Sequence, residues 1–309
     1  MKLKKRIKRL RVRLSDAVDL RDSRNLDISD IKSVCLALGP YRNLTTLTAS
    51  ILFLHPNCQV LNHAGRRVYG NREIDFLWDY NKEKLDRFVQ FAIKISGKGQ
   101  RGPLGGSITY SHAFDSIHNV KGIYEKSGSG MIKKQIKCLF WKESLRTSNA
   151  IRERNVDLAG IFKSDERLRF LLPIRHPLDC AVSNLKTGHV RIFRGLTKDS
   201  SIFEVAKAIL DEIFWFADLK KEFPGRFFYY LEREISRDML VHLAKFLLLD
   251  PDGTWVSNAL SAMKIKPGYD HDSKLIDFYR DYVVDKGSRF PELSKSLLAF
   301  LNSRDGNER

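Results

Sequence analysis

The sequence predicts an α/β fold in which a central, mainly parallel sheet is flanked by helices. Short apolar runs that are typical of buried strands alternate with longer segments whose apolar residues recur at helical spacing. Such alternation favours parallel strands joined by helical crossovers. With 309 residues the chain is long enough for one large core. We expect a single α/β domain over residues 31–309, preceded by a basic N-terminal segment over residues 1–30.

Each element is predicted from its local pattern. The strands are short, mostly apolar runs at residues 34–38, 58–61, 107–110, 136–141, 169–174 and 226–231. The helices have apolar residues three and four positions apart, over residues 46–54, 74–95, 148–163, 202–221 and 237–249. A further helix starts near Leu178, and the tail from about Lys274 is helical.

The net charge is unusual for a globular composition. Hydrophobic residues make up 43% and charged residues 29%, but 54 Lys and Arg stand against 37 Asp and Glu, which gives a net charge of +17. Such a charge predicts attraction to polyanions, among them nucleic acid, anionic glycans, acidic lipid headgroups and phosphate-bearing cosubstrates. No run of about 18 apolar residues occurs, so we expect no transmembrane segment.

The N-terminal segment and the cysteines predict where the protein is located. The start, MKLKKRIKRLRVRL, has no apolar core and is not a secretory signal. It is either a solvated basic tail or a basic helix in peripheral contact with an anionic membrane. The four cysteines are far apart and none forms a C-x-x-C pair, which favours a reduced compartment and no zinc site. We expect a bacterial cytoplasmic protein, with the inner face of the membrane as the alternative.

A phosphate-binding loop is predicted between the first strand and the first helix of the domain. Residues 38–46 read LGPYRNLTT, and N–H groups at a helix start hold anions with help from the helix dipole. Thr45 and Thr46 add hydroxyl donors, and Arg42 adds a fixed charge. A Walker loop has Gly-Lys where this loop has Leu44 and Thr45. A P-loop that binds ATP or GTP with magnesium is therefore disfavoured.

A second anion-binding element follows a later strand. Residues 170–183 read FLLPIRHPLDCAVS, in which Arg175 ends the strand and Pro177 begins a helix at a favoured position. Ser183 lies about two turns into that helix. Arg175 and Ser183 are therefore expected to converge on one phosphate, the first with a bidentate fork and the second with a hydroxyl.

These segments resemble the sulfotransferases that use 3′-phosphoadenosine 5′-phosphosulfate. That family carries a [RK]-S-G-T-T-like loop followed by a helix and HP, and this chain has Arg42-Asn43-Leu44-Thr45-Thr46 and then His55-Pro56. The family later carries R-[DN]-P with a serine eight residues after the arginine. Here that segment is Arg175-His176-Pro177, with Ser183 at the serine position.

A third segment extends the resemblance to about residues 31–250. The family often has Y-E-D-L after a late strand and F-L-G-L at the end of the next helix. This chain has Tyr230-Leu231-Glu232 and then Lys245-Phe246-Leu247-Leu248-Leu249. Two departures concern the local geometry: Leu44 stands where glycine is usual, and His176 stands where Asp or Asn is usual.

The resemblance implies a set of ligand-binding roles. The loop of Arg42, Asn43, Leu44, Thr45 and Thr46 would hold the 5′-phosphosulfate of the cosubstrate. Arg175 and Ser183 would hold the 3′-phosphate. A basic, glycine-containing segment near the C-terminus, here with Lys266 and Tyr269, would contact the same phosphate. The product would be 3′,5′-adenosine bisphosphate, and no metal is required.

Sulfuryl transfer also needs a base for the acceptor hydroxyl and a cation for the leaving group. Arg42 suits the leaving group. His63 follows strand 58–61, where glycan sulfotransferases place their base, and CQVLNH is similar to the heparan 2-O type. His112, after strand 107–110, is a second candidate for the base or an acceptor ligand, and Glu143 is a third candidate for the base.

Lys142 is the predicted contact of the transferred sulfuryl group. It ends strand 136–141, where the cytosolic small-molecule branch of the family carries K-T-H. Glu143 and Ser144 follow instead, and the missing histidine favours the glycan, heparan-type branch.

The predicted function is transfer of a sulfuryl group to a hydroxyl of a carbohydrate acceptor, which is a polysaccharide, oligosaccharide or glycolipid. Basic residues in excess, such as Arg66 and Arg67, favour an anionic or polymeric acceptor. Two alternatives remain open: a P-loop kinase or NTPase, and a basic nucleic-acid-binding protein. The latter has charge alone in its favour, because no RNP, KH, zinc-finger or helix-turn-helix signature occurs, and we expect no specific nucleic acid partner.

Overall fold

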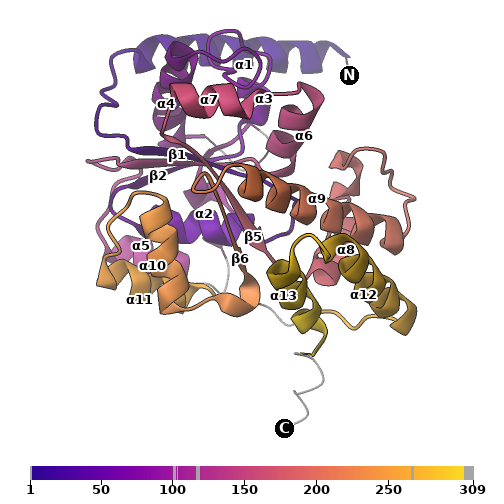
Figure 1. Ribbon diagram of the computed structural model, residues 1–309. Helices are drawn as coiled ribbons and strands as arrows, with labels where there is room; N and C mark the ends of the chain where they lie inside the picture. Colours follow the sequence, from indigo (N-terminus) through magenta and orange to yellow (C-terminus); the bar gives the residue numbers. More distant parts are fainter. Residues whose placement is uncertain (1, 100–101, 103, 116–118, 266–267, 303–309) are drawn as a thin grey trace.

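A six-stranded, mainly parallel sheet forms the centre of the computed structural model, which describes residues 2–99, 102, 104–115, 119–265 and 268–302 (Figure 1). The strands are β1 (Ser33–Ala37), β2 (Cys58–Asn62), β3 (Gly106–Ser107), β4 (Cys138–Lys142), β5 (Leu168–Ile174) and β6 (Phe227–Leu231). Their order is β3-β2-β4-β1-β5-β6, and β3 alone among them pairs antiparallel. The predicted α/β class is confirmed.

Helices cover both faces of this sheet, because successive residues of a buried strand point to opposite sides. Val34 and Leu36 of β1 belong to one apolar cluster, whereas Cys35 and Ala37 belong to the other. The first cluster includes residues of α3 (Gly65–Val68), α4 (Lys82–Ser96), α6 (Leu145–Glu153), α7 (Leu158–Ser164), α8 (Pro177–Thr187), α9 (Ile202–Glu222), α12 (Ser273–Gly287) and α13 (Pro291–Asn302). The second includes residues of α2 (Thr45–Leu54), α5 (Val120–Lys126), α10 (Arg237–Phe246) and α11 (Gly253–Ala262).

The N-terminal segment is helical, and ion pairs connect it to the residues that follow. Helix α1 (Lys2–Ser23) packs against α4. Asp19 on α1 is 1% exposed and forms ion pairs with Arg67, at 3.0 Å, and with Lys98. Asp16 also pairs with Arg67, at 2.6 Å. Among the described helices, none is both long and apolar enough to cross a membrane.

The prediction of a helix over residues 74–95 is wrong for its first third, residues 74–81. Helix α4 begins at Lys82, because the side chain of Asn81 caps it and accepts a hydrogen bond from the N–H of Lys84 at 2.8 Å. The residues before it form turns, in which Asp75 Oδ2 accepts from Gly70 N–H at 2.6 Å. Phe76 is buried there at 1% exposure, so its apolar spacing reflects the core and not a helix.

Two further elements differ from their predictions. The helix expected over residues 148–163 is two helices, α6 and α7, because Asn155 has a φ of 48° and Asp157 caps α7 through Gly160 N–H. The strand expected over residues 107–110 is shorter. Only Gly106–Ser107 pairs with β2, and Ile108–Tyr110 form one turn of 3₁₀ helix that Ser107 caps.

The cap of α4 gives a testable prediction. Asn81→Ala removes the side-chain acceptor for Lys84 N–H, so we expect the free energy of unfolding to fall by about 1 kcal/mol. Urea denaturation measures this change, and Asn81→Asp, which keeps an acceptor oxygen, should lie within a few tenths of a kcal/mol of the wild type. Equal stability of the wild type and the alanine variant would show that the cap does not define the start of this helix.

Candidate active site

The predicted site residues come from strands whose carboxyl ends lie at one edge of the sheet. Asn62 at the end of β2 is paired in register with Lys142 at the end of β4, and His63 N–H donates to Lys142 O at 2.9 Å. Strand β1 lies between β4 and β5 and leads into the loop at residues 38–46. Ligands of open α/β sheets bind at such carboxyl ends.

Three residues of the loop after β1 have positive φ angles, in the left-handed region that glycine adopts most easily. Gly39 has a φ of 84°, and a Cβ at this position would lie 2.2 Å from Leu172 Cδ1, so no side chain fits. Arg42 and Leu44 have φ values of 63° and 59°. Leu44 therefore adopts the conformation that glycine takes most easily, at a cost of roughly 1–2 kcal/mol. The departure from the family's loop does not prevent a tight turn.

Helix α2 begins at this turn without a side-chain cap. Leu44 occupies the cap position and its side chain accepts no hydrogen bond from the helix. The N–H groups in the first turn of a helix have no partner within the helix and carry the positive end of the dipole. These N–H groups, together with the hydroxyls of the buried Thr45 and the half-buried Thr46, are donors that could hold an anion.

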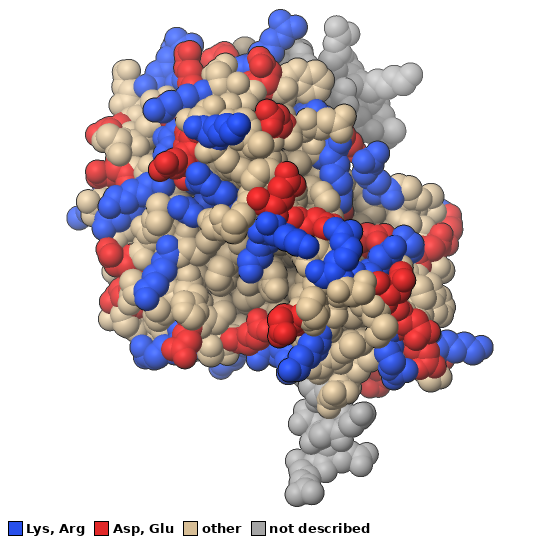
Figure 2. Space-filling view, viewed as in Figure 1, with Lys and Arg blue, Asp and Glu red and all other residues tan. Residues whose placement is uncertain are grey.

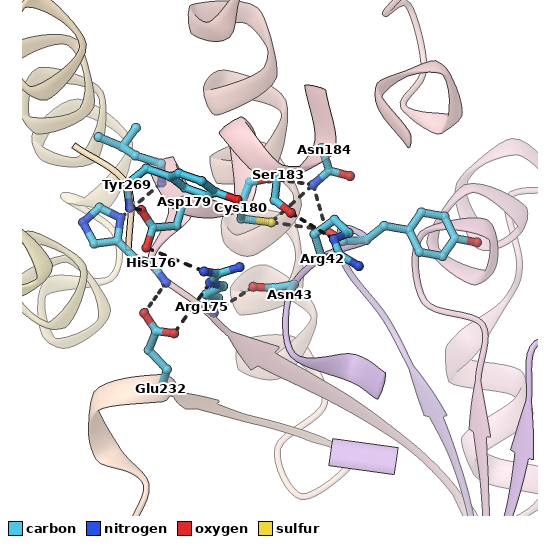
Figure 3. A network of polar contacts seen from close by, with 12 residues as sticks. Arg42, Asn43, Arg175, His176, Asp179, Cys180, Ser183, Asn184, Glu232 and Tyr269 are labelled. Carbon is cyan, nitrogen blue, oxygen red and sulfur yellow. Dashed lines mark hydrogen bonds and ion pairs between the residues drawn. The ribbon is translucent and has the colours of Figure 1, made fainter. Parts of the chain in front are cut away.

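The loop is bonded directly to β5 and α8, as Figure 3 shows. Arg175 N–H donates to Asn43 Oδ1 at 2.7 Å, and Arg42 Nε donates to Ser183 Oγ at 2.9 Å. Asn184 Nδ2 donates to the carbonyl of Tyr41 at 2.8 Å. The two anion-binding elements of the sequence are therefore parts of one cluster.

The donors of this cluster fit a phosphate group. Among the described residues, the buried atoms Asn43 Nδ2 and Arg175 Nε have no hydrogen-bond partner. The Arg175 guanidinium lies 3.9 Å from a carboxylate oxygen of Asp179 and 3.9 Å from one of Glu232. These ion pairs orient the guanidinium but are too long to be hydrogen bonds, so its donors can bind the oxygens of an anion.

His176 caps the start of α8, a position at which Asp and Asn are also favoured. Its Nδ1 accepts from Leu178 N–H at 3.3 Å at the start of α8. Its own N–H donates to Glu232 Oε1 at 2.9 Å. The ring is buried and packs against His271, Tyr279 and Phe300. This second departure from the family therefore keeps the local geometry.

The C-terminal segment reaches the same cluster through Asp179. The N–H of Tyr269 donates to Asp179 Oδ1 at 3.0 Å, and His271 Nε2 lies 2.9 Å from the same oxygen. The predicted contact Lys266 lies outside the described residues. His176, Asp179 and His271 have ligand atoms within 4.8 Å of one another, but Asp179 Oδ1 already accepts two hydrogen bonds. We infer that these three side chains hold the C-terminal segment with Tyr269 in place.

His63 and Lys142 form a hydrogen-bonded pair beside the loop. Lys142 Nζ lies 3.1 Å from His63 Nε2, and the Lys142 side chain is buried. Burial, with Lys142 and Arg146 nearby, lowers the pKa of His63 to about 2. Burial, with Arg42 nearby and offset by Glu143, lowers the pKa of Lys142 to about 8. At neutral pH a charged lysine therefore donates to a neutral imidazole.

Glu143 lies next to this pair: it follows Lys142 in the sequence, and its Oε2 lies 4.0 Å from His63 Nδ1. It is 3% exposed, and burial raises its pKa. Its carboxylate accepts from Gly65 N–H at 2.9 Å and lies 3.4 Å from both Tyr41 Oη and Arg146 Nε. These contacts make Glu143 a positioning group for the turn after His63.

Two other histidines, His112 and His189, act electrostatically on His63. His112 is exposed in a turn and not at the end of a strand, and it acts electrostatically on His63. His189, which the sequence patterns did not indicate, follows α8 and its ring centroid lies 5.3 Å from that of Tyr41. Its only sequence signal is the glycine before it, which ends the helix that carries Ser183.

Comparison with known proteins finds no matching family description and no matching curated protein. Solved structures with a similar chain course include sulfotransferases. Mouse SULT7A1 complexed with PAP is 10% identical, covers 92% of this chain and 93% of its own, and has a TM-score of 0.44. A sulfotransferase from Alicyclobacillus acidocaldarius is 12% identical, with coverages of 84% and 95% and a TM-score of 0.41. STF9 from Mycobacterium avium is 11% identical, with coverages of 94% and 82% and a TM-score of 0.42.

The low pKa of His63 predicts acid sensitivity. Below pH 6.5 the unfolded chain binds a proton at His63, whereas the folded chain does not until the pH approaches 2. This contribution to stability is present above pH 6.5 and is lost progressively as the pH falls. We expect His63→Asn, which tolerates the φ of 57°, to weaken the decline of unfolding free energy between pH 6.5 and 5. The upper limit is about 1.4 kcal/mol per pH unit.

Chemical denaturation at several pH values measures this slope. His242→Asn is the matched control, because that histidine is exposed on α10. Parallel profiles for the wild type and His63→Asn would contradict a neutral His63 in the folded protein.

Proposed function

We propose that the protein is a sulfotransferase that moves a sulfuryl group from 3′-phosphoadenosine 5′-phosphosulfate to a hydroxyl of a carbohydrate. One observation carries this proposal: two arginine-containing motifs, separated by more than a hundred residues, share direct hydrogen bonds. Arg42 bonds Ser183, and Asn43 bonds the backbone of Arg175. A ligand with phosphate groups at both ends of a nucleoside is complementary to two such adjoining anion sites.

The chain's own donors divide between the two ends of the cosubstrate. The start of α2 and its threonine hydroxyls suit the 5′-phosphosulfate, and Arg175 with Ser183 suits the 3′-phosphate. Arg42 lies between them, because its Nε contacts Ser183 while its backbone belongs to the loop. The cosubstrate would supply the sulfuryl group and leave as 3′,5′-adenosine bisphosphate.

Lys142 is the residue that, under this proposal, stabilises charge during transfer. The ammonium group has a pKa of about 8 and is mostly protonated at pH 7. It is 4% exposed, so its field is screened less than that of a surface lysine. Preorganised cations of this kind are the main means by which a protein stabilises a developing oxyanion. The neutral His63 holds Lys142 in position without competing for the anion.

The carbohydrate acceptor is proposed from the charge around α3. A cavity of about 640 Å³ lies between α1 and the segment that follows His63. Its lining includes Arg21, Arg24 and Arg66 together with the acidic Asp16 and Glu73. Arg66 is exposed and offers its charge to a ligand. Figure 2 shows Lys and Arg interspersed with Asp and Glu on the visible face, so the positive surplus is not one uniform patch there. An oligosaccharide with scattered anionic groups matches this pattern better than a nucleic acid backbone does.

Ligand-dependent unfolding tests the proposal. At a concentration of 100 times its dissociation constant, 3′,5′-adenosine bisphosphate should stabilise the protein by about 2.7 kcal/mol and raise the melting temperature by several degrees. ADP, and ATP with magnesium, should produce much smaller shifts. Arg175→Ala should abolish the shift, because it removes the guanidinium donors of the 3′-phosphate site.

Arg280→Ala is the control for the loss of one positive charge, because Arg280 is on the exposed side of α12 and pairs with Asp277. A shift with ATP and magnesium alone would favour a kinase or NTPase instead. No shift with any nucleotide would refute the nucleotide site.

A further inference from the structure

His189 is brought back to the phosphate loop by the turn that ends α8. Gly188 has a φ of 70°, which reverses the chain after Thr187 and which a residue with a side chain adopts only under strain. His189 then begins a single 3₁₀ turn, His189–Ile192. Its ring packs on that of Tyr41, with an angle of 39° between the planes.

Thr187 determines which nitrogen of His189 carries the proton. The Thr187 hydroxyl donates its single proton to the carbonyl of Ser183 at 2.7 Å, since a carbonyl can only accept. Thr187 Oγ1 also lies 2.6 Å from His189 Nδ1. Both hydrogen bonds form together only if His189 Nδ1–H is the donor of the second. The neutral ring then has its basic lone pair on Nε2.

The lone pair of His189 Nε2 is available, whereas that of His63 is not. No described residue forms a hydrogen bond with His189 Nε2, and the side chain is partly exposed. In His63, by contrast, Nε2 accepts from Lys142, and Nδ1 lies 4.0 Å from Glu143 Oε2. Protonating His63 would place two cations against each other.

The charges around His189 keep it neutral at rest. Burial lowers its pKa, and Arg42 of the loop, Lys142 of β4 and Arg146 of α6 lower it further. His63 after β2 is a further titratable neighbour, and Thr187 on α8 and Tyr41 in the loop are polar neighbours. A neutral imidazole beside bound anions is the state that a general base requires before the reaction.

We propose that His189 is the general base of this site and takes the proton of the acceptor hydroxyl at Nε2. The inference rests on the proposed function. The acceptor oxygen forms the new O–S bond as the bond from sulfur to the bridging phosphate oxygen breaks. The electron pair of that bond leaves with 3′,5′-adenosine bisphosphate, and the hydroxyl proton passes to Nε2. Thr187 keeps Nδ1–H in place throughout.

The first test observes the tautomer directly, without turnover. Protein labelled with ¹⁵N-histidine is examined by long-range ¹H–¹⁵N correlation spectra, in which His189→Gln identifies the signals of His189. We expect a protonated Nδ1 and an unprotonated Nε2 in the wild type, and a mixture of tautomers in Thr187→Val. A protonated Nε2 in the wild type overturns the proposal.

The second test measures release of 3′,5′-adenosine bisphosphate from 3′-phosphoadenosine 5′-phosphosulfate with desulfated glycosaminoglycan oligosaccharides, or water alone, as acceptor. His189→Gln should lower kcat by about 10²–10⁴-fold and should remove the acidic limb of the pH profile. Its dissociation constant for 3′,5′-adenosine bisphosphate should equal that of the wild type. His242→Gln, at an exposed histidine of α10, should behave as the wild type in both measurements.

These outcomes separate the two levels of inference. If the bisphosphate does not bind the wild type, the proposed function fails. If it binds, but His189→Gln keeps its turnover and its acidic limb, the function stands and the base is a different residue. Loss of the acidic limb in His63→Gln in place of His189→Gln would assign the base to His63.

Discussion

The hydrogen bond from the N–H of Arg175 to Asn43 Oδ1 is the contact on which the rest of the site depends. Asn43 is fully buried, and its amide joins the end of β5 to the loop after β1. A buried acceptor of this kind is costly to leave unpaired, so the two segments are held in one relative position. That position lets Arg42 reach Ser183, and the start of α2 beside it has no side-chain cap.

Backbone strain is concentrated around this contact. Eight described residues other than glycine have a positive φ, and five of them lie at the carboxyl edge of the sheet: Arg42, Leu44, His63, Ala64 and Ser144. Such conformations cost about 1–3 kcal/mol each and persist only where packing determines them. Here the fully buried strands β1, β2 and β4 provide that packing. The fold therefore gives up stability at the edge where the anion-binding donors are gathered.

The electrostatics of the edge follow from burial. Two imidazoles and one ammonium group lie close together with Arg42 and Arg146, and their pKa values are lowered because the low-dielectric site disfavours several like charges. A bound polyanion would offset this repulsion between like charges. Under the proposed function, bound phosphate groups would therefore make the neutral imidazole of His189 a stronger base for the acceptor hydroxyl.

Much of this arrangement was determined by the sequence alone. Apolar runs defined the strands, and alternation with helices defined a parallel sheet. The positions of Lys142 and Arg175 at strand ends, and of Arg42 in the loop after the first strand, followed directly. Local caps at Asn81 and Asp157 interrupted two predicted helices, because apolar spacing records burial and does not distinguish a helix from buried turns. Only the tertiary structure showed that Leu44 can adopt a glycine-like conformation and that Nε2 of His63 already accepts a hydrogen bond from Lys142. It alone also revealed His189, because the basicity of a histidine nitrogen depends on which partners the fold places beside it, and sequence spacing does not contain that information.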